Sequence, residues 1–115
     1  MNIKYRITAE KINLDIDTAI PLGLITNELA TNAYKYAFTE KPNGLIEIEF
    51  RHLPDHQYAL RIADNGKGLP QEFNLEASST LGLKLVKLLS RQIKAKLHYH
   101  INNGTAFQIV FAENT

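Results

Sequence analysis

The sequence contains no cysteine, and it has no long apolar run. Without cysteine, neither a disulfide framework nor a thiolate metal site can form. A run of ~20 apolar residues would be needed to cross a bilayer, and residues 1–6 lack the long apolar core of a signal peptide. Low-complexity segments, internal repeats and interdomain linkers are missing too, and the ordinary globular composition fits neither a disordered tail nor a fibrous protein.

The net charge is also small, because 13 Lys and Arg nearly balance 12 Asp and Glu. This balance argues against a protein built mainly to coat nucleic acid or anionic lipid, so we expect no nucleic-acid partner and no direct membrane contact. What is present is an ordinary globular composition, with 44% hydrophobic and 22% charged residues. A chain of 115 residues has the length of one domain, and we expect a single domain over residues 1–115.

Alternation of apolar and polar residues predicts six strands. They cover residues 3–7, 12–16, 46–50, 58–63, 97–101 and 107–111. The first two are expected to form a hairpin through residues 8–11. Later hairpins are expected to turn at residues 53–57 and 102–104, where Pro, Asp, Asn and Gly favour tight turns.

Apolar residues at helical spacing predict a first helix at residues 19–38. Asp17 and Thr18 are candidate caps, Pro21 suits the first turn, and a turn at residues 42–44 ends the segment. The apolar stripe of this helix consists of Leu22, Ile25, Leu29, Ala33, Tyr36 and Ala37.

The same spacing predicts a second helix at residues 81–93, with Val86 and Ile93 on its flanks. Its core-facing residues are expected to be Leu81, Leu85, Leu88 and Leu89. The order of all these elements favours an α+β fold, a two-layer sandwich with the helices on one face of a mixed, mostly antiparallel sheet.

Three polar residues share one face of the first predicted helix. Glu28 and Asn32 are four residues apart, and Lys35 follows three residues later. A carboxylate, an amide oxygen and an ammonium group in one column could serve a metal-phosphate site, since the amide oxygen is a hard ligand for Mg²⁺ and the ammonium is a point charge for phosphate. The alternative is a solvated helix face with an ordinary i,i+4 pair.

A glycine-rich segment, Asp-Asn-Gly-Lys-Gly at residues 64–68, follows the fourth predicted strand. Its two glycines would let the backbone turn tightly beside a flat ligand, and the Asp64 carboxylate could accept a hydrogen bond from an exocyclic amine. A plain Asn-Gly turn is the alternative. Residues 78–80, Ser-Ser-Thr, could place an anion at the start of the second helix or simply cap it.

Basic side chains line the second predicted helix at spacings of three and four residues. They are Lys84, Lys87, Arg91 and Lys94. Such a stripe is usually only a solvated face, and its functional interpretation is a docking surface for an acidic partner. We expect none of the histidines, at positions 52, 56, 98 and 100, to be catalytic.

Four segments, taken in order, resemble the motifs of the histidine-kinase and gyrase-type ATPase superfamily. Residues 27–38 (NELATNAYKYAF) resemble its N box, 64–68 (DNGKG) its first glycine box, 81–86 (LGLKLV) its second glycine box, and Gly104-Thr105 with Phe107 its closing G-T-x-F element. Residues 19–25 are especially similar to one branch of sensor histidine kinases, with a variant phosphoacceptor domain and a short ATP lid. The resemblance covers essentially the whole chain.

The resemblance implies a Bergerat-type ATP-binding fold and a role for each matching residue. Asn32 would be the Mg²⁺ ligand, Glu28 would assist the attacking group, and Lys35 would contact phosphate. Asp64 would accept a hydrogen bond from the adenine amine. The other nucleotide-binding positions would be Tyr36, Gly66, Gly68, Thr80, Gly82, Leu83 and Thr105.

The sequence departs from the family pattern in three places. Thr80 stands where the second glycine box usually begins with glycine, and residues 69–80 are short for an ATP lid, although we expect them to be mobile without nucleotide. No histidine-bearing helix precedes the first strand. The chain is therefore expected to be either a fragment of a longer kinase or a stand-alone ATPase-fold protein.

The implied function is the ATP-binding catalytic domain of a cytoplasmic-facing sensor histidine kinase, with ATP and Mg²⁺ as cofactors. It would transfer the γ-phosphoryl group to a histidine on a separate dimerisation domain of the same kinase, which would serve a response regulator. The domain would be inactive without that acceptor. The alternatives are a stand-alone anti-sigma-factor serine kinase and a non-enzymatic nucleotide-binding module of the same fold.

Overall fold

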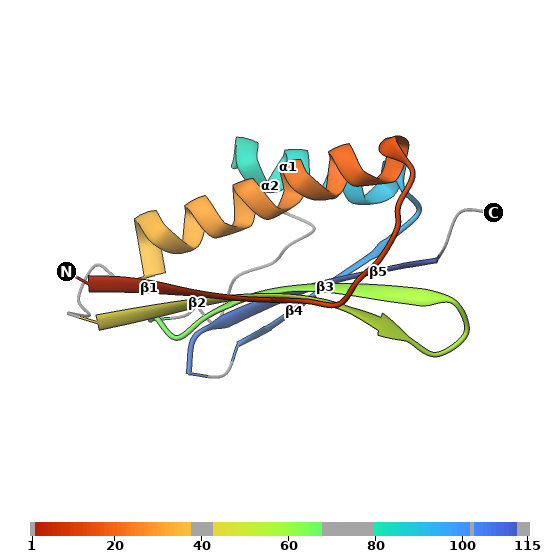
Figure 1. Ribbon diagram of the computed structural model, residues 1–115. Helices are drawn as coiled ribbons and strands as arrows, with labels where there is room; N and C mark the ends of the chain where they lie inside the picture. Colours follow the sequence, from red (N-terminus) through yellow and green to blue (C-terminus); the bar gives the residue numbers. More distant parts are fainter. Residues whose placement is uncertain (1, 38–42, 68–79, 102, 113–115) are drawn as a thin grey trace.

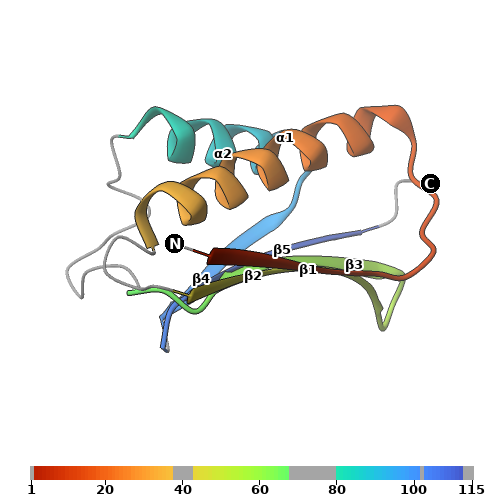
Figure 2. The same cartoon turned by 60° about the vertical axis from the view of Figure 1, so that its left-hand side comes forward.

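The computed structural model of the chain describes residues 2–37, 43–67, 80–101 and 103–112. Within them, a five-stranded sheet of order β1-β2-β3-β5-β4 carries both helices on one face (Figure 1 and Figure 2). β1 pairs in parallel with β2, and the other neighbours pair antiparallel, which confirms the predicted α+β sandwich. In chain order the elements are β1 (Asn2–Ala9), α1 (Ile16–Asn32), the π-helical turn η1 (Ala33–Ala37), β2 (Asn43–Leu53), β3 (Gln57–Asp64), α2 (Leu81–Gln92), β4 (Lys96–Ile101) and β5 (Thr105–Ala112).

The predicted hairpin through residues 8–11 is wrong, because β1 joins its neighbour β2 through α1. Parallel strands need a crossover connection of this kind, and in Figure 1 the chain runs from the end of β1 to the helix layer. Ile12 and Leu14 lie in that connection and pack against the core, while Ile16 is the first residue of α1. Because this connection buries every second residue, its apolar residues alternate as they do in a strand, and the prediction took it for one.

α1 begins earlier than its apolar stripe indicates. Its N-cap is Asp15, whose carboxylate accepts a hydrogen bond from the Thr18 N–H at 3.0 Å. Asp17 lies in the first turn and Pro21 inside the helix, so the predicted caps and the first-turn position of Pro21 are wrong. Ile16 is exposed at the start of the helix, and this is why the buried stripe did not mark the true N-terminus.

After Asn32 the helix changes its winding and continues as the single π-helical turn η1. Such turns are rare and are frequently found at functional sites. The predicted stripe is confirmed for its buried members Leu22, Ile25, Leu29 and Ala33. The side chains of Tyr36 and Ala37, like residue 38, lie outside the described part of the chain.

The turns agree with the sequence in two places and differ in one. Residues 54–56 join β2 to β3, with positive φ angles of 63° at Asp55 and 57° at His56. The β4–β5 hairpin turns beside Gly104, as predicted. The predicted turn at 42–44 is wrong for Asn43 and Gly44, which already pair with β1 as part of β2, and Pro42 lies outside the described residues.

α2 packs on the sheet and α1 with a different face from the predicted one. Its buried residues are Leu83, Val86, Leu89 and Ser90. Leu81 is 83% exposed and Leu88 is 58% exposed, so their assignment to the core is wrong, whereas Leu85 is half-buried. The helix carries two apolar lines of helical spacing, and only the tertiary contacts decide which of them is buried.

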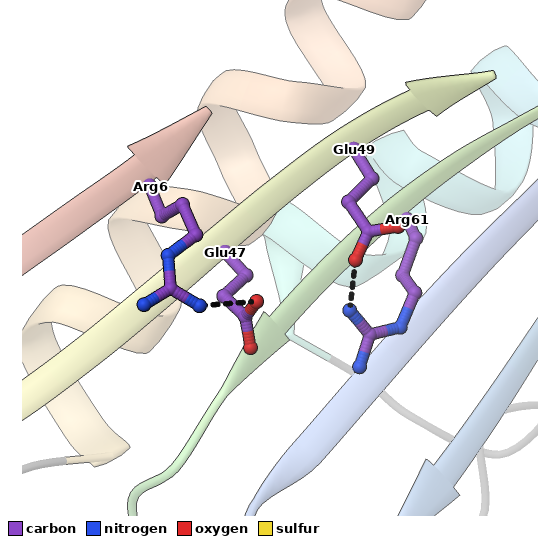
Figure 3. A network of polar contacts seen from close by, with 4 residues as sticks. All are labelled: Arg6, Glu47, Glu49 and Arg61. Atoms are coloured by element: carbon purple, nitrogen blue, oxygen red, sulfur yellow. Dashed lines mark hydrogen bonds and ion pairs between the residues drawn. The ribbon is translucent and has the colours of Figure 1, made fainter. Parts of the chain in front are cut away.

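The sheet face opposite the helices carries charged side chains that alternate with core residues. Arg6 Nη1 lies 3.4 Å from Glu47 Oε2, and Arg61 Nη1 lies 2.9 Å from Glu49 Oε1 (Figure 3). Ion pairs at or near the surface contribute between 0 and about 1 kcal/mol, so these two pairs add little to the stability of the fold. In the part of the chain that the structure describes, no helix has the length and apolar character of a membrane span.

Candidate functional site

One half of the candidate site lies where the C-terminal part of α1 meets the first turn of α2. A β-carbon added at Gly82 would lie 2.8 Å from Glu28 Oε2 and 3.5 Å from Asn32 Nδ2. The first distance is shorter than real β-carbon contacts, so with any other residue at position 82 the Glu28 carboxylate would have to move from its present place. The N box and the second glycine box, far apart in the sequence, therefore meet in the fold through Glu28, Asn32 and Gly82, which we call the helix half of the site.

The first turn of α2 adds hydrogen-bond donors to this half. Thr80 is the N-cap, and its side chain makes no capping hydrogen bond. The backbone N–H of Lys84 donates to the Thr80 carbonyl at 3.0 Å, but the first N–H groups of any helix have no partner within it. Those amides, with the positive end of the helix dipole, suit an anionic group.

The other half of the site is built on the sheet. Asp64, the last residue of β3, pairs with Ile46 of β2 on one side and with Thr105 of β5 on the other. Directly paired residues of antiparallel strands point to the same face, and Ile46 and Thr105 are buried. The half-buried Asp64 therefore lies on the helix-covered side, and the first glycine box meets the G-T-x-F element there.

Hydrogen bonds hold the loop that follows β3. One Asp64 carboxylate oxygen accepts from the Gly66 N–H at 2.9 Å, which orients the carboxylate. The Asn65 N–H donates to the Leu45 carbonyl at 3.2 Å, and the Leu45 N–H donates back to Asn65 Oδ1 at 2.8 Å. Asn65 thus ties the loop to β2 in both directions.

Gly104 completes the sheet half, which consists of Asp64, Asn65, Gly104 and Thr105. Its φ angle is 132°, a backbone conformation open mainly to glycine. A β-carbon there would overlap the Asp64 carbonyl oxygen and lie 2.9 Å from Asn65 Cα. The β4–β5 hairpin can therefore close against the β3 loop only with glycine at this position.

Contacts around Ala33 join the two halves. Ala33, the residue after α1, packs in one buried cluster with Ile46, which is the strand partner of Asp64, and η1 contacts β3. In Figure 2 the end of α1, the start of α2 and the end of β3 lie together at the left-hand end of the molecule. The segments named by the resemblance therefore gather at one end of the fold.

The remaining expected residues are placed less completely. Lys35 is exposed on η1, next to the helix half, while Leu83 is buried on the inner face of α2. The side chain of Tyr36, and Gly68 with the rest of residues 68–79, lie outside the described residues. The expectation of a mobile lid at 69–80 therefore stays a prediction.

Asn65 and Gly104 hold the site together through contacts that the sequence did not indicate. Asn65 stood only as part of an Asn-Gly turn, which looks the same whether or not its side chain bonds to a strand 20 residues away. Gly104 stood in the predicted hairpin turn and in the G-T-x-F element. A positive φ angle at Gly104 was foreseeable from the turn, but its contact with Asp64 was not.

The residues present fit a magnesium nucleotide. No group of three or more His, Cys, Asp or Glu able to hold a metal occurs among the described residues. Mg²⁺ with phosphates does not need one, because it keeps its waters and takes only one or two protein oxygens, such as the Asn32 amide. The close approach at Gly82 and the donors of α2 suit phosphate, and the Asp64 carboxylate suits an amine.

Sequence comparison places the chain among ATPases. Residues 17–115 match the family described as histidine kinase-, DNA gyrase B-, and HSP90-like ATPase. Blue-light-activated histidine kinase 2 of Erythrobacter litoralis is 26% identical over 96 residues, covering 84% of this chain and 28% of that protein. Sensor histidine kinase PdtaS of Mycolicibacterium smegmatis is 34% identical over 89 residues, covering 76% of this chain and 18% of that protein. The chain spans less than a third of either relative's length.

Solved structures show the same fold. The histidine kinase domain of the Erythrobacter litoralis EL346 blue-light activated histidine kinase superposes with a TM-score of 0.90 at 25% identity, over 96% of this chain and 52% of that one. The mycobacterial sensor histidine kinase MprB superposes with a TM-score of 0.77 at 22% identity, over 97% of this chain and 83% of that one. The second likeness concerns the fold alone.

Proposed function

The chain belongs to the histidine kinase-, DNA gyrase B-, and HSP90-like ATPase family, and from this premise we propose that it is the ATP-binding catalytic domain of a sensor histidine kinase. The observation that carries the proposal is the meeting of Glu28, Asn32 and Gly82 between α1 and α2. These residues come from two motifs that are far apart in the sequence, and the packing of α1 against α2 brings their side chains and the first turn of α2 together. The named relatives, a blue-light-activated histidine kinase and a sensor histidine kinase, support the same choice.

In the proposed reaction the γ-phosphoryl group leaves the β-phosphate oxygen and forms a bond to an imidazole nitrogen. Mg²⁺, when bound, would supply positive charge that neutralises the phosphates, and the Asn32 amide oxygen would hold it. Lys35 contacts phosphate, and Glu28 orients the attacking imidazole and accepts its proton. The N–H groups at the start of α2, near Thr80, Gly82 and Leu83, bind phosphate oxygens.

The sheet half binds the base in this proposal. The Asp64 carboxylate, oriented by the Gly66 N–H, accepts a hydrogen bond from the adenine amine, and Thr105 supports it from the neighbouring strand. Tyr36 and Gly68 are added to the proposed nucleotide contacts on the resemblance alone. Because a guanine carries a carbonyl where adenine carries the amine, a carboxylate at this position favours ATP over GTP.

The acceptor belongs to another domain. We propose that it is a histidine on the dimerisation domain of the same kinase, that the phosphoryl group then passes to a response regulator, and that the domain works in the cytoplasm. The described histidines are not placed beside the helix half. His52 lies in β2 with its ring against Tyr58, and His56 lies in the turn between β2 and β3. His98 and His100 are exposed on β4 and alternate with Leu97 and Tyr99, which pack against the core.

The proposal is tested by incubating the chain with γ-labelled ATP and Mg²⁺. Alone it should remain unlabelled; with the histidine-bearing domain of its kinase it should label that domain, slowly, because two separate domains lack the effective concentration of a tether. The label should be lost in hot acid, as phosphohistidine is. Acid-stable label would instead identify an anti-sigma-factor-type serine kinase, and failure to bind Mg-ATP would leave only a non-enzymatic module.

Two substitutions assign the roles within the helix half. Glu28→Gln should lower the transfer rate about 100-fold or more by removing the proton acceptor, with ATP affinity nearly unchanged, while Asn32→Ala should abolish labelling and the Mg²⁺ dependence of ATP binding. Glu47→Gln is the matched control, since its carboxylate lies on the opposite sheet face beside Arg6. Glu28→Gln with a full transfer rate would remove Glu28 from the chemistry.

A further inference from the structure

One edge of the sheet is the outer side of β1, and the nucleotide site does not use it. Among the described strands β1 pairs only with β2, so a row of its backbone groups is open to another strand. Figure 1 shows β1, in dark red, along the front of the sheet and below the helix layer. An extended segment of another protein can add to such an edge as one more strand.

A hydrogen bond to β2 identifies which backbone groups of β1 point outward. The Glu10 N–H, directly after the strand, donates to the Phe50 carbonyl of β2 at 2.8 Å. Successive residues of a paired strand direct their N–H and C=O groups alternately to one side and to the other. The even-numbered residues of β1 therefore bond to β2, and Ile3, Tyr5 and Ile7 direct their backbone groups away from the sheet.

The side chains along this edge are apolar on one face and basic on the other. Ile3 packs against the buried cluster at the end of α1. Tyr5 and Ile7 follow on the same face at the two-residue period of a strand, and they are 51% and 69% exposed. Lys4 and Arg6 lie on the opposite face, and both are exposed. The helices thus leave an apolar strip uncovered along the edge, with two positive charges behind it.

Neighbouring carboxylates compensate these two charges only in part. Lys4 has no carboxylate of the described residues within ion-pair distance. Arg6 pairs with Glu47 at 3.4 Å, yet its side chain stays 64% exposed (Figure 3). Glu10, the next acidic residue along the chain, accepts a hydrogen bond from the His52 N–H of β2. A strand added beside β1 therefore meets a basic row on this face.

We propose that the edge of β1 binds an extended segment of a partner protein in which apolar residues alternate with acidic ones. Such a segment hydrogen-bonds to Tyr5 and Ile7, packs its apolar side chains beside them and sets its carboxylates beside Lys4 and Arg6. The same charges disfavour a second copy of this chain. Antiparallel pairing of two β1 strands about Tyr5 would put Lys4 of each copy opposite Arg6 of the other.

The probe is a synthetic nine-residue peptide of alternating glutamate and valine, with both ends capped. It is titrated into the isotope-labelled chain, and amide chemical shifts and hydrogen exchange are followed. Shift changes should concentrate on β1. Exchange should slow about tenfold or more at the amides of Tyr5 and Ile7, and much less at those of Lys4 and Arg6, which already bond to β2. No binding, shifts centred on another element, or equal slowing at all four amides would overturn the proposal.

Two control peptides test the charge and the alternation. Lysine in place of glutamate should weaken binding about tenfold or more, because like charges then face each other across the strands. A peptide with the glutamates and valines in separate blocks should bind as weakly, because it cannot direct one kind of side chain to each face. Binding of either control as tight as that of the probe contradicts the assignment.

A charge reversal on the chain assigns the contact to β1. Lys4→Glu should weaken binding of the glutamate peptide about fivefold to tenfold and strengthen that of the lysine peptide. Lys96→Glu is the matched control, because it makes the same change at an exposed position of the other edge strand, β4, and it should leave both affinities unchanged. Equal losses from the two changes would mean general charge attraction and no strand addition.

Ile7→Pro tests the backbone contact, because it removes an outward N–H that β2 does not use, and edge strands tolerate proline at such positions. The variant should keep a folded amide spectrum and bind the probe about tenfold more weakly. Full binding by the folded variant would rule out pairing at this edge. If the variant does not fold, Lys4→Glu still decides.

A second copy of the chain is the remaining occupant. Sedimentation velocity of the chain alone should show a monomer at all concentrations tested. A concentration-dependent dimer that Ile7→Pro removes would replace the partner segment with self-association.

Discussion

The two halves of the candidate site are held by different kinds of contact. In the sheet half, backbone pairing places Asp64 between two strands, reciprocal hydrogen bonds join Asn65 to Leu45, and Gly104 packs directly on backbone atoms. In the helix half, side chains from one helix approach the backbone of another at Gly82. One half is positioned by the sheet, and the other by how α1 packs on α2.

The two kinds of contact predict that the two halves differ in how rigid they are before nucleotide binds. Backbone positions in the middle of a paired sheet open only with much of the fold, whereas side chains on a helix surface change rotamer on a far shorter timescale. We therefore expect the sheet half to be formed before nucleotide binds and the helix half to adjust to the phosphates. Substitutions in the two halves should accordingly differ in what they damage.

The largest effect is expected from Gly104→Ala, which attacks the sheet half through its backbone. The positive φ angle strains any β-carbon, and the added atom would overlap the Asp64 carbonyl. We expect the free energy of unfolding to fall by about 2–4 kcal/mol, together with nucleotide affinity, as measured by urea denaturation and titration calorimetry.

Gly23→Ala is the matched control for that change. A β-carbon at Gly23, on the exposed side of α1, meets nothing within 4 Å, and alanine is the better helix former by up to ~1 kcal/mol. The control should be neutral or slightly stabilising. If Gly104→Ala were equally harmless, the close packing of the hairpin on the β3 loop would be wrong.

A smaller effect, confined to binding, is expected from Asp64→Asn. The amide oxygen can still accept from the Gly66 N–H, so the fold should persist, but one acceptor becomes a donor facing the base. A hydrogen bond to a charged group contributes about 1.5–3 kcal/mol, which corresponds to a tenfold to hundredfold loss of ATP affinity by calorimetry. Discrimination against GTP should shrink as well.

For this change the comparison is with Asp55→Asn, on the β2–β3 turn, which should alter neither affinity nor discrimination. If Asp64→Asn bound ATP as tightly as the parent chain, the proposal that adenine binds at the sheet half would be wrong. Loss of stability without a selective loss of adenine binding would give Asp64 a structural role instead.

The smallest effect is expected from Gly82→Ala in the helix half. The obstacle is the end of a flexible side chain, Glu28 Oε2 at 2.8 Å, which can rotate aside. Stability should be nearly unchanged, and ATP affinity should fall about threefold to tenfold because the phosphate-binding amides are partly covered. Isothermal titration of both proteins measures the change.

A double-variant cycle sharpens this prediction. In a Glu28→Ala background the obstacle is absent, so Gly82→Ala should cost less affinity there than in the parent chain. Equal losses in both backgrounds would mean that the close approach of Glu28 and Gly82 does not govern phosphate binding.

Much of the fold was accessible from the sequence, and the failures share one cause. Strands β2 to β5 and the burial of Leu22, Ile25 and Leu29 follow from local periodicity, and the structure confirms them. The alternation of apolar and polar residues is the same in a strand and in the connection that contains Ile12 and Leu14. The two differ in their pairing, because β1 pairs in parallel with β2, which lies much later in the sequence.

The second helix illustrates the same limit. Leu81 and Leu88 have the spacing of a core stripe, yet Val86 is the residue buried completely. Which of the two apolar lines of α2 is buried depends on how the helix packs against α1 and the sheet. The local sequence of α2 carries no information on that packing. For the site, the motifs predict Glu28, Asn32, Asp64 and Gly82, and their roles stay predictions. The contacts that Asn65 and Gly104 make across the sheet emerged only from the structure.

The parallel pairing of β1 also governs the order in which the sheet can form during translation. Each residue of β1 pairs with one 41 positions later, so at about 5–20 residues per second β1 waits roughly 2–8 s for its partner to be synthesised. Through that interval Tyr5 and Ile7, exposed even in the finished sheet, have no neighbouring strand. β1 therefore cannot take its place in the sheet until α1 and β2 have both left the ribosome.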